Sequence, residues 1–261
     1  MGRGGKQAAS QSDVHQDGRV SVTLSDEDAL RLLAESKIIG GRRIHWGSNY
    51  TFLVHIDAGP GQYIPAVYKP REGETPLYDF PEGTLYRREY AAYVFGRALG
   101  WPAIPPTVLR EGPYGVGSMQ LYVDSSSKAT YFDLIQDKRD ELLPFALFDF
   151  VANNADRKAG HCLLGGDGRI WSIDHGLTFH EDFKVRTVMF DLWGAHVTPA
   201  LLAKLDAVAG DLDSKDETIA ELGELLTGSE IDALKRRAEY VLAEPVIPEL
   251  DPYRNVPWPL V

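Results

Sequence analysis

The sequence predicts an α+β fold in two lobes, with strands concentrated in the first lobe and helices in the second. Segments that read as strands between turn residues lie almost entirely before residue 124. Segments with a helical period of apolar residues dominate after that point. The 261 residues suit one large domain or two lobes that share a cleft.

Composition excludes several classes of protein. The chain is 44% hydrophobic, which is typical of a soluble globular protein. Its single cysteine excludes an intramolecular disulfide and a Cys-based zinc site, which favours a reducing compartment, the cytoplasm. No stretch approaches about 18 apolar residues, and no secretory signal is expected. A net charge of −11 argues against nucleic-acid and membrane partners and favours soluble ones.

The first lobe is expected over residues 19–123, after a disordered tail at 1–18 that is rich in Gly, Ser, Gln and charge. An N-cap-type serine, acidic residues and leucines predict a helix over 25–36. Strand-like segments between turn residues then predict an antiparallel meander, over 44–48, 50–56 and 63–69.

The rest of the first lobe combines one long helix with two strands. An apolar stripe predicts the helix over 84–99, with Gly100 as its stop. The strands are expected at 107–110 and 117–123. The polar run at 124–128 then marks the boundary of the second lobe, which extends to residue 261.

The second lobe begins with a helix over 140–152 that is apolar nearly all round and is therefore expected to be buried. A glycine-rich turn predicts a hairpin with strands at 161–164 and 169–173. Helical periods predict three further helices, over 199–208, 215–226 and 229–242. The last begins with Ser229-x-x-Asp232, a pattern like a capping box.

Two aspartates flank the predicted hairpin. Asp156 follows the buried helix on a short loop, and Asp174 ends the second hairpin strand. Because the hairpin brings both ends to one place, we expect the two carboxylates to converge. Such a pair suits divalent-metal chemistry, since Mg²⁺ prefers one or two carboxylates together with substrate phosphates.

The first lobe supplies the opposite charge. Lys69 ends a strand, and Glu89 lies on the following helix, twenty residues later. A strand lysine paired with a helix glutamate holds the phosphates of ATP in kinase-type sites. The Gly47-Ser48 turn would let backbone N–H groups approach phosphates. The chain contains neither G-x-G-x-x-G nor G-x-x-x-x-G-K-[ST], so no protein-kinase glycine loop and no Walker A motif is assigned.

Four segments stand in a fixed order along the chain: AVYKP at 66–70, REY at 88–90, NADRKAGH at 154–161 and IDHGL at 173–177. Together they resemble the phosphatidylinositol 3-/4-kinase-like atypical kinase superfamily, over about residues 40–190. More narrowly, the chain resembles a group of actinobacterial proteins described as similar to those lipid kinases. The resemblance implies a two-lobed protein-kinase-like fold with ATP and Mg²⁺, or Mn²⁺, in the cleft.

The resemblance also implies the nucleotide-binding residues. Lys69 would bind phosphate, Glu89 would be its partner on the helix, and Ser48 would belong to the turn above the phosphates. Adenine would pack against the segment between the lobes, at 119–123, which includes Gln120 and Tyr122.

The same resemblance makes Asp156 the group that orients or deprotonates the acceptor hydroxyl, and Asp174 a metal ligand. His161 stands where relatives have an asparagine metal ligand, and an imidazole suits Mg²⁺ less well than an oxygen does. Lys158 replaces a histidine of some relatives and would neutralise the phosphoryl group in transfer.

The acceptor is expected to be a hydroxyl of a protein or a small molecule. The segment after Asp174, residues 178–186, mixes acidic and basic residues and lacks the cationic cluster that inositol phosphates require. Four alternatives stay open. They are a nucleotide-binding pseudokinase, a phosphatidylinositol kinase, a nucleotidyl (AMP) transferase, and a metal-dependent hydrolase built from His161, His175, His180 and Asp174.

Overall fold

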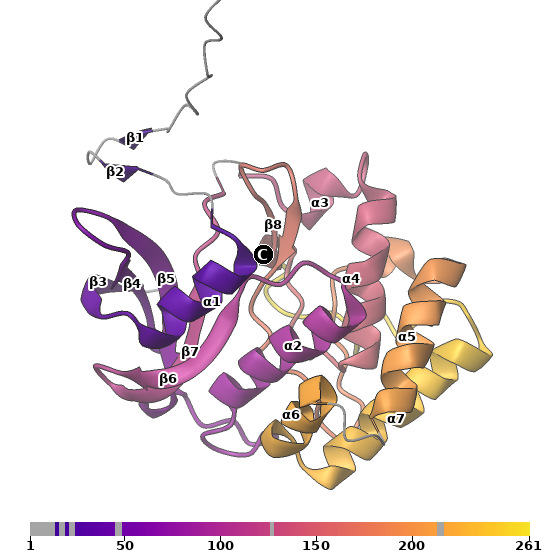
Figure 1. Cartoon of the computed structure of the whole chain (residues 1–261). Coiled ribbons are helices and arrows are strands. Elements are labelled where there is room, and N and C mark those ends of the chain that lie inside the picture. Colours follow the sequence, from indigo (N-terminus) through magenta and orange to yellow (C-terminus); the bar gives the residue numbers. More distant parts are fainter. Residues whose placement is uncertain (1–13, 16–18, 21–23, 45–48, 126–127, 213–216) are drawn as a thin grey trace, which may run out of the picture.

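The computed structural model describes residues 14–15, 19–20, 24–44, 49–125, 128–212 and 217–261. It is a mixed α and β fold in which a five-stranded antiparallel sheet lies on one side and most helices lie on the other (Figure 1). Two helices, α1 (Asp26–Glu35) and α2 (Leu85–Leu99), pack against the sheet, and α2 also contacts the helical half. The predicted fold class is confirmed.

The sheet has the strand order β3-β4-β5-β7-β6, in which every neighbouring pair is antiparallel. Its strands are β3 (Ile38–Ile44), β4 (Thr51–Asp57), β5 (Tyr63–Pro70), β6 (Thr107–Gly112) and β7 (Gly115–Leu121). Alternate residues of β5 are buried, and Ile64, Ala66 and Tyr68 pack into a core beneath the sheet with α1. The predicted meander is therefore present.

Local sequence explains the two helices on the sheet. The Ser25 side chain accepts a hydrogen bond from the backbone N–H of Asp28 at 3.1 Å, which caps α1 as predicted. Helix α2 ends at Gly100, whose φ of 76° is left-handed and suits glycine. Ten residues of α2 are buried, because the helix lies between the sheet and the helical half.

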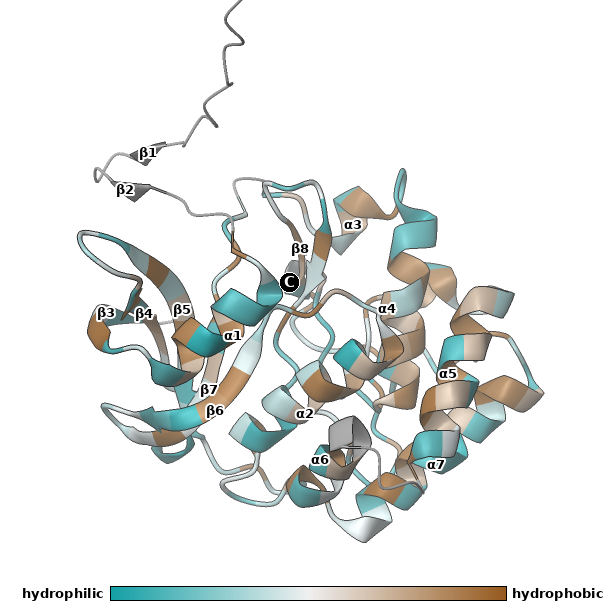
Figure 2. Cartoon of the chain, viewed as in Figure 1, coloured by the Kyte–Doolittle hydropathy of each residue, from teal (hydrophilic) through white to brown (hydrophobic). Residues whose placement is uncertain are grey.

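The helical half surrounds a second, larger core. Its helices are α3 (Tyr131–Leu134), α4 (Arg139–Val151), α5 (Pro199–Asp211), α6 (Glu217–Leu225) and α7 (Gly228–Ala243). Helix α4 is hydrophobic over much of its length (Figure 2), and its phenylalanines contribute to this core. A short hairpin, β8 (Cys162–Leu164) and β9 (Ile170–Ser172), lies beside α3, and Cys162 is fully buried there.

Three shorter helical turns of the 3₁₀ type complete the chain, at Arg71–Gly73, Ala159–His161 and Phe190–Leu192. Strands β1 (Val14–His15) and β2 (Arg19–Val20) form a separate antiparallel pair. Most of the predicted tail, 1–18, lies outside the described residues. The lobe boundary near residue 124 stays a prediction.

Several predicted elements differ from the structure in their bounds: the strand predicted at 117–123 is Gly115–Leu121, and the helix predicted at 199–208 extends to Asp211. The first strand of the meander is Ile38–Ile44, whereas the predicted segment 44–48 lies almost wholly outside the described residues. This strand is at the sheet edge and is largely exposed, so it lacks the apolar alternation that marks half-buried strands. Helix α7 begins at Gly228, one residue earlier than predicted. Its capping box is formed by Thr227 and Glu230 instead of Ser229 and Asp232.

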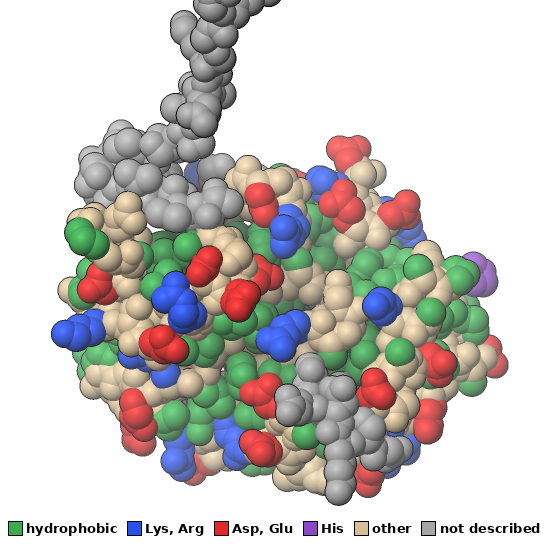
Figure 3. All heavy atoms as spheres, viewed as in Figure 1, with side chains coloured by type: hydrophobic (Ala, Val, Ile, Leu, Met, Phe, Trp, Pro, Cys, Tyr) green, Lys and Arg blue, Asp and Glu red, His purple; other side chains and the backbone are tan. Residues whose placement is uncertain are grey.

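The face of the molecule drawn in Figure 3 carries side chains of both charges. Acidic and basic side chains are interspersed over the face seen in Figure 3 and do not gather into a basic patch there. Among the described residues, every helix is too short or too polar to span a bilayer.

Candidate active site

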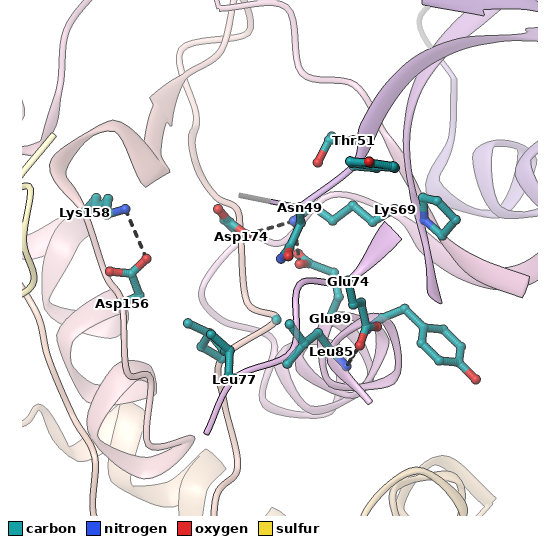
Figure 4. A pocket seen from close by; sticks show the side chains of 15 residues that line it. Asn49, Thr51, Lys69, Glu74, Leu77, Leu85, Glu89, Asp156, Lys158 and Asp174 are labelled. Atoms are coloured by element: carbon teal, nitrogen blue, oxygen red, sulfur yellow. Dashed lines mark hydrogen bonds and ion pairs between the residues drawn. The ribbon is translucent and has the colours of Figure 1, made fainter. Parts of the chain in front are cut away.

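Lys69 joins the sheet to both other parts of the site. It lies near the end of β5, on the face opposite the buried Tyr68. Its Nζ atom is 2.7 Å from Oε2 of Glu89 on α2 and 2.8 Å from Oδ1 of Asp174 (Figure 4). Burial disfavours the charge of Lys69, but Asp174 and Glu89 outweigh this effect and raise its pKa. Lys69 is therefore a fixed cation between two carboxylates.

Glu89 is held from two directions. Its side chain is 1% exposed, and Oε1 accepts a hydrogen bond from the backbone N–H of His175 at 3.1 Å. The other oxygen, Oε2, meets Lys69. A buried carboxylate requires such partners, because an unpaired charge in the interior is strongly destabilising. Glu89 thereby connects β5 to the segment that carries Asp174.

Asp174 follows β9 in a left-handed backbone conformation, with φ of 61°. Such conformations are unusual for residues with a Cβ atom and concentrate at functional sites. The side chain is 51% exposed. The positive charge of Lys69 is the main cause that lowers the pKa of Asp174, so this carboxylate is ionised at the cleft.

His161 faces the second oxygen of the same carboxylate, with Nε2 3.4 Å from Oδ2 of Asp174. Its other nitrogen, Nδ1, accepts a hydrogen bond from the backbone N–H of Lys158 at 3.3 Å. Burial lowers the pKa of His161 to about 4, so the ring is neutral at pH 7. Because Nδ1 accepts this hydrogen bond, the proton is assigned to Nε2, which faces Asp174.

Asp156 lies on the loop that follows α4. Its backbone N–H donates to Oδ1 of Asn154 at 3.1 Å, and the preceding residue, Ala155, donates to the carbonyl of Leu177 at 2.8 Å. Oδ2 of Asp156 is 3.2 Å from Nζ of Lys158 (Figure 4). Burial raises the pKa of Asp156, against the opposing charge of Lys158.

A buried arginine, Arg157, anchors the loop that carries Asp156. Arg157 is fully buried and binds the Asp149 carboxylate of α4, with Nε 2.8 Å from Oδ2 and Nη2 2.8 Å from Oδ1. Nη2 also lies 2.8 Å from Oγ of Ser172 and 3.0 Å from Nε2 of His175. Arg157 thus fixes the loop carrying Asp156 to the segment carrying Asp174.

These groups line one cleft with a volume of about 210 Å³. Lys69, Glu89, Asp156, Lys158 and Asp174 all contribute to its wall. Figure 4 shows Lys69 reaching toward Asp174 from the sheet and Glu89 from α2, with Asp156 and Lys158 on the other side of Asp174. These five residues therefore bring two cations and three carboxylates to the cleft, from four separate segments of the chain.

Comparisons with known proteins show the family and the fold of the chain. No protein-family model matches the chain. Protein Rv2133c of Mycobacterium tuberculosis (strain ATCC 25618 / H37Rv) is 37% identical over 276 residues, which cover 92% of this chain and 98% of that protein. The chain belongs to the Rv2133c family.

More distant likenesses of this Rv2133c-family chain show its fold. Phosphatidylinositol 4-kinase gamma 4 of Oryza sativa subsp. japonica is 31% identical over 160 residues, which cover 54% of this chain but 28% of that protein. The Golgi casein kinase with Mn/ADP bound matches with a TM-score of 0.58 at 18% identity, covering 88% of this chain and 77% of that one. Hydra Fam20 with sugar matches at 0.51 and 15% identity, covering 89% and 93%. The fold is that of atypical kinases in general, and the narrower assignment to the phosphatidylinositol 3-/4-kinase-like superfamily is not shown.

Two of the predicted nucleotide-binding residues, Gln120 and Tyr122, do not line the described cleft of this Rv2133c-family chain. Gln120 is 5% exposed within β7, which pairs with a strand on each side. Its Nε2 donates to Oγ1 of Thr107 on β6 at 2.9 Å. Tyr122 is 40% exposed beyond the strand, and its backbone N–H donates to the carbonyl of Pro65. Ser48 lies outside the described residues.

The hydrolase cluster does not form. The described residues contain no group of three or more His, Cys, Asp or Glu side chains that could hold a metal ion. His175 is buried against Arg157, and Nδ1 of His180 accepts from the backbone of Asp182 at 3.0 Å, so neither ring joins His161 at Asp174.

Several lining residues were missed by sequence reasoning. Asn49 and Thr51 come from the start of β4, and Glu74 and Leu77 come from the loop before α2. Glu74 accepts hydrogen bonds from the first backbone N–H groups of α2, at 2.8 Å and 3.1 Å. A glutamate eleven residues before a helix gives no local capping signal, so only the fold reveals this role.

Proposed function

We propose that the chain is an ATP-dependent phosphotransferase, an atypical kinase that transfers the γ-phosphoryl group of ATP to a hydroxyl group. The observation that carries this proposal is the position of Lys69, whose Nζ meets both Glu89 and Asp174 at the cleft. Phosphoryl transfer is catalysed mainly by positioning and by neutralisation of charge. A lysine held in this way suits the binding of phosphate oxygens.

A kinase fold implies a divalent cation, either Mg²⁺ or Mn²⁺. The donor set fits such an ion, because Asp174 is an ionised, half-exposed carboxylate at the cleft. Asp174 would hold the ion, with His161 as a second ligand if its proton moved from Nε2 to Nδ1. The ion would supply neutralisation of the phosphate charge.

The other residues take roles that follow from their chemistry. Lys69 orients phosphate oxygens, and Glu89 orients Lys69. Asp156 accepts the proton of the acceptor hydroxyl, a task that its raised pKa favours because a more basic carboxylate is a better proton acceptor. Lys158 breaks its ion pair with Asp156 and then neutralises the charge of the phosphoryl group during transfer.

The surroundings of Asp156 favour a protein or small-molecule hydroxyl over a phosphorylated inositol lipid. Nζ of Lys184 is 3.3 Å from Asp79, and Nε of Arg186 donates to the carbonyl of Ala155 at 2.7 Å. Glu181 and Asp182 add negative charge to the same segment. An anionic headgroup would meet few cations there.

The test combines ligand binding with mass measurement. ATP with Mg²⁺ or Mn²⁺ should raise the melting temperature of the chain, because a ligand of the folded state stabilises it. Incubation with ATP and candidate acceptors should then give acceptors, or the chain itself, that are heavier by one phosphoryl group. Asp174→Asn should abolish the gain.

Other outcomes would contradict the proposal in different ways. A rise in melting temperature without any transfer, across a broad acceptor set, would indicate a pseudokinase. A gain of AMP would indicate a nucleotidyl transferase, and transfer confined to phosphatidylinositol would indicate a lipid kinase. No nucleotide binding at all would leave the kinase fold without this activity.

A further inference from the structure

Arg88 precedes Glu89 on α2 and turns its side chain toward the helical half. The residue is 2% exposed. Its Nη2 binds Oε1 of Glu230, its Nη1 donates to the carbonyl of Thr178 at 2.7 Å, and its Nε lies 3.2 Å from Oγ1 of Thr84. One guanidinium therefore connects α2 both to α7 and to the segment that follows Asp174.

The partner of Arg88 is also fixed. Glu230 is 6% exposed, and its Oε2 accepts a hydrogen bond from the backbone N–H of Thr227 at 2.9 Å in the capping box of α7. Each oxygen of the carboxylate thus has its own partner. Removing either charge of a buried pair leaves the other uncompensated, so this contact is strongly favoured in the folded state.

Neighbouring side chains of α2 point the same way. Nη2 of Arg87 donates to the carbonyl of Glu224, and the hydroxyl of Tyr90 donates to Oε1 of Glu221, both on α6. Helix α2 is therefore tied to the helical half on both sides of Glu89. Rotation of α2 that moved Glu89 away from Lys69 would have to break these contacts.

The segment after Asp174 offers no exposed hydroxyl for phosphorylation. In many kinases, phosphorylation of this segment sets the position of the helix that carries the glutamate. Here residues 175–189 contain only two hydroxyl side chains, Thr178 and Thr187. Both are buried, and each makes a hydrogen bond within the segment.

We propose that the Arg88–Glu230 ion pair, and not phosphorylation of the segment after Asp174, keeps Glu89 against Lys69. Arg88 is a positioning residue that acts through α2, and the site is preassembled. The catalytic meaning of this arrangement rests on the proposed kinase function, but the arrangement itself does not.

The test measures the Lys69–Glu89 contact without nucleotide. The full chain is acetylated briefly under native conditions, and the labelling rate of each lysine is read by peptide mass spectrometry. An amine held between two carboxylates reacts slowly, so a faster rate at Lys69 reports the loss of its contact with Glu89. Arg88→Met and Glu230→Gln should each speed the labelling of Lys69 roughly tenfold. Gln at 230 can still cap α7, which provides a milder variant should Arg88→Met unfold.

Two controls make the result specific. Arg97→Met changes an exposed arginine of the same helix and should leave the rate at Lys69 unchanged. Lys204, exposed on α5, should react at one rate in every variant. Equal rates at Lys69 in the wild type and in folded Arg88→Met or Glu230→Gln would overturn the proposal.

The result separates this proposal from the proposed function. If Arg88→Met speeds the labelling of Lys69 but the wild type binds no nucleotide, the role of the Arg88–Glu230 ion pair is supported and the kinase function is contradicted. If the wild type binds ATP and transfers phosphate while Lys69 does not respond, the reverse holds.

Discussion

The Asp174 carboxylate is shared between a cation and an imidazole, each on its own oxygen. Because the His161 N–H faces the carboxylate, a metal ion must compete with that N–H group for the carboxylate oxygen. An asparagine at this position offers a carbonyl oxygen, which Mg²⁺ prefers. We therefore expect His161→Asn to strengthen Mg²⁺-dependent ATP binding by about tenfold, with a smaller gain for Mn²⁺.

Thermal-shift titration of ATP with each metal, in the wild type and the variant, measures this effect. His161→Ala serves as the control, because it removes the imidazole without supplying an oxygen. Equal gains in the asparagine and alanine variants would mean that the carbonyl oxygen takes no part in metal binding.

Asp156 predicts a pH-dependent effect on stability. Its pKa is raised, chiefly by burial, so the folded chain keeps this carboxylate charged at a cost. That cost is complete above the raised pKa, shrinks as the pH falls through it, and is absent below the ordinary pKa of 3.8. Asp156→Asn should therefore raise the melting temperature at neutral pH and leave it unchanged below pH 3.8. Thermal melts across this range, monitored by circular dichroism, measure this effect. A variant that melts below the wild type at neutral pH would contradict the prediction.

Among the elements, the loop at 74–84 connects the sheet to the helical half. Phe80 is 5% exposed and packs with Leu85, Ala155 and Leu177. Removing its ring leaves a cavity beneath the cleft, so Phe80→Ala should lower the free energy of unfolding by about 3 kcal/mol. Denaturant unfolding gives this value.

Tyr78 provides the matched control in the same loop, because it is 99% exposed. Tyr78→Ala should change the free energy of unfolding by less than about 0.5 kcal/mol. Similar losses in both variants would show that the loop does not dock through Phe80.

For the molecule as a whole, a net charge of −11 sets the long-range field. Duplex DNA is a dense polyanion, and its binding requires cations that release counterions. Because the face in Figure 3 also lacks a basic patch, we expect no DNA complex even at low ionic strength. A gel-shift assay checks this, and a salt-sensitive complex would contradict it.

Local signals in the sequence were sufficient for much of this fold. Ser25 and Gly100 set the limits of α1 and α2, and the glycine-rich turn after β8 marks the hairpin. These signals are local because caps and turns depend on a few adjacent residues. The juxtaposition of Lys69, Glu89 and Asp174 was also expected, but through the resemblance to atypical kinases and not from local signals.

Features that depend on distant partners were not predictable. The edge strand β3 is defined by pairing with β4, and Arg88 finds Glu230 across 142 positions of the chain. The capping role of Glu230 was missed because Ser229, two residues after Thr227, is an equally plausible N-cap residue in the sequence. Gln120 was assigned to the cleft through the resemblance, whereas its buried side chain bonds Thr107 on the neighbouring strand, a cross-strand contact that the sequence does not show.

Cys162 has a practical consequence for further experiments. The thiol is fully buried on β8, and burial raises its pKa to about 12, so almost none of it is thiolate at pH 7. It is also the only native thiol in the chain. A cysteine introduced on the surface would react alone with a maleimide, so fluorophores can report on cleft closure without first replacing the native residue.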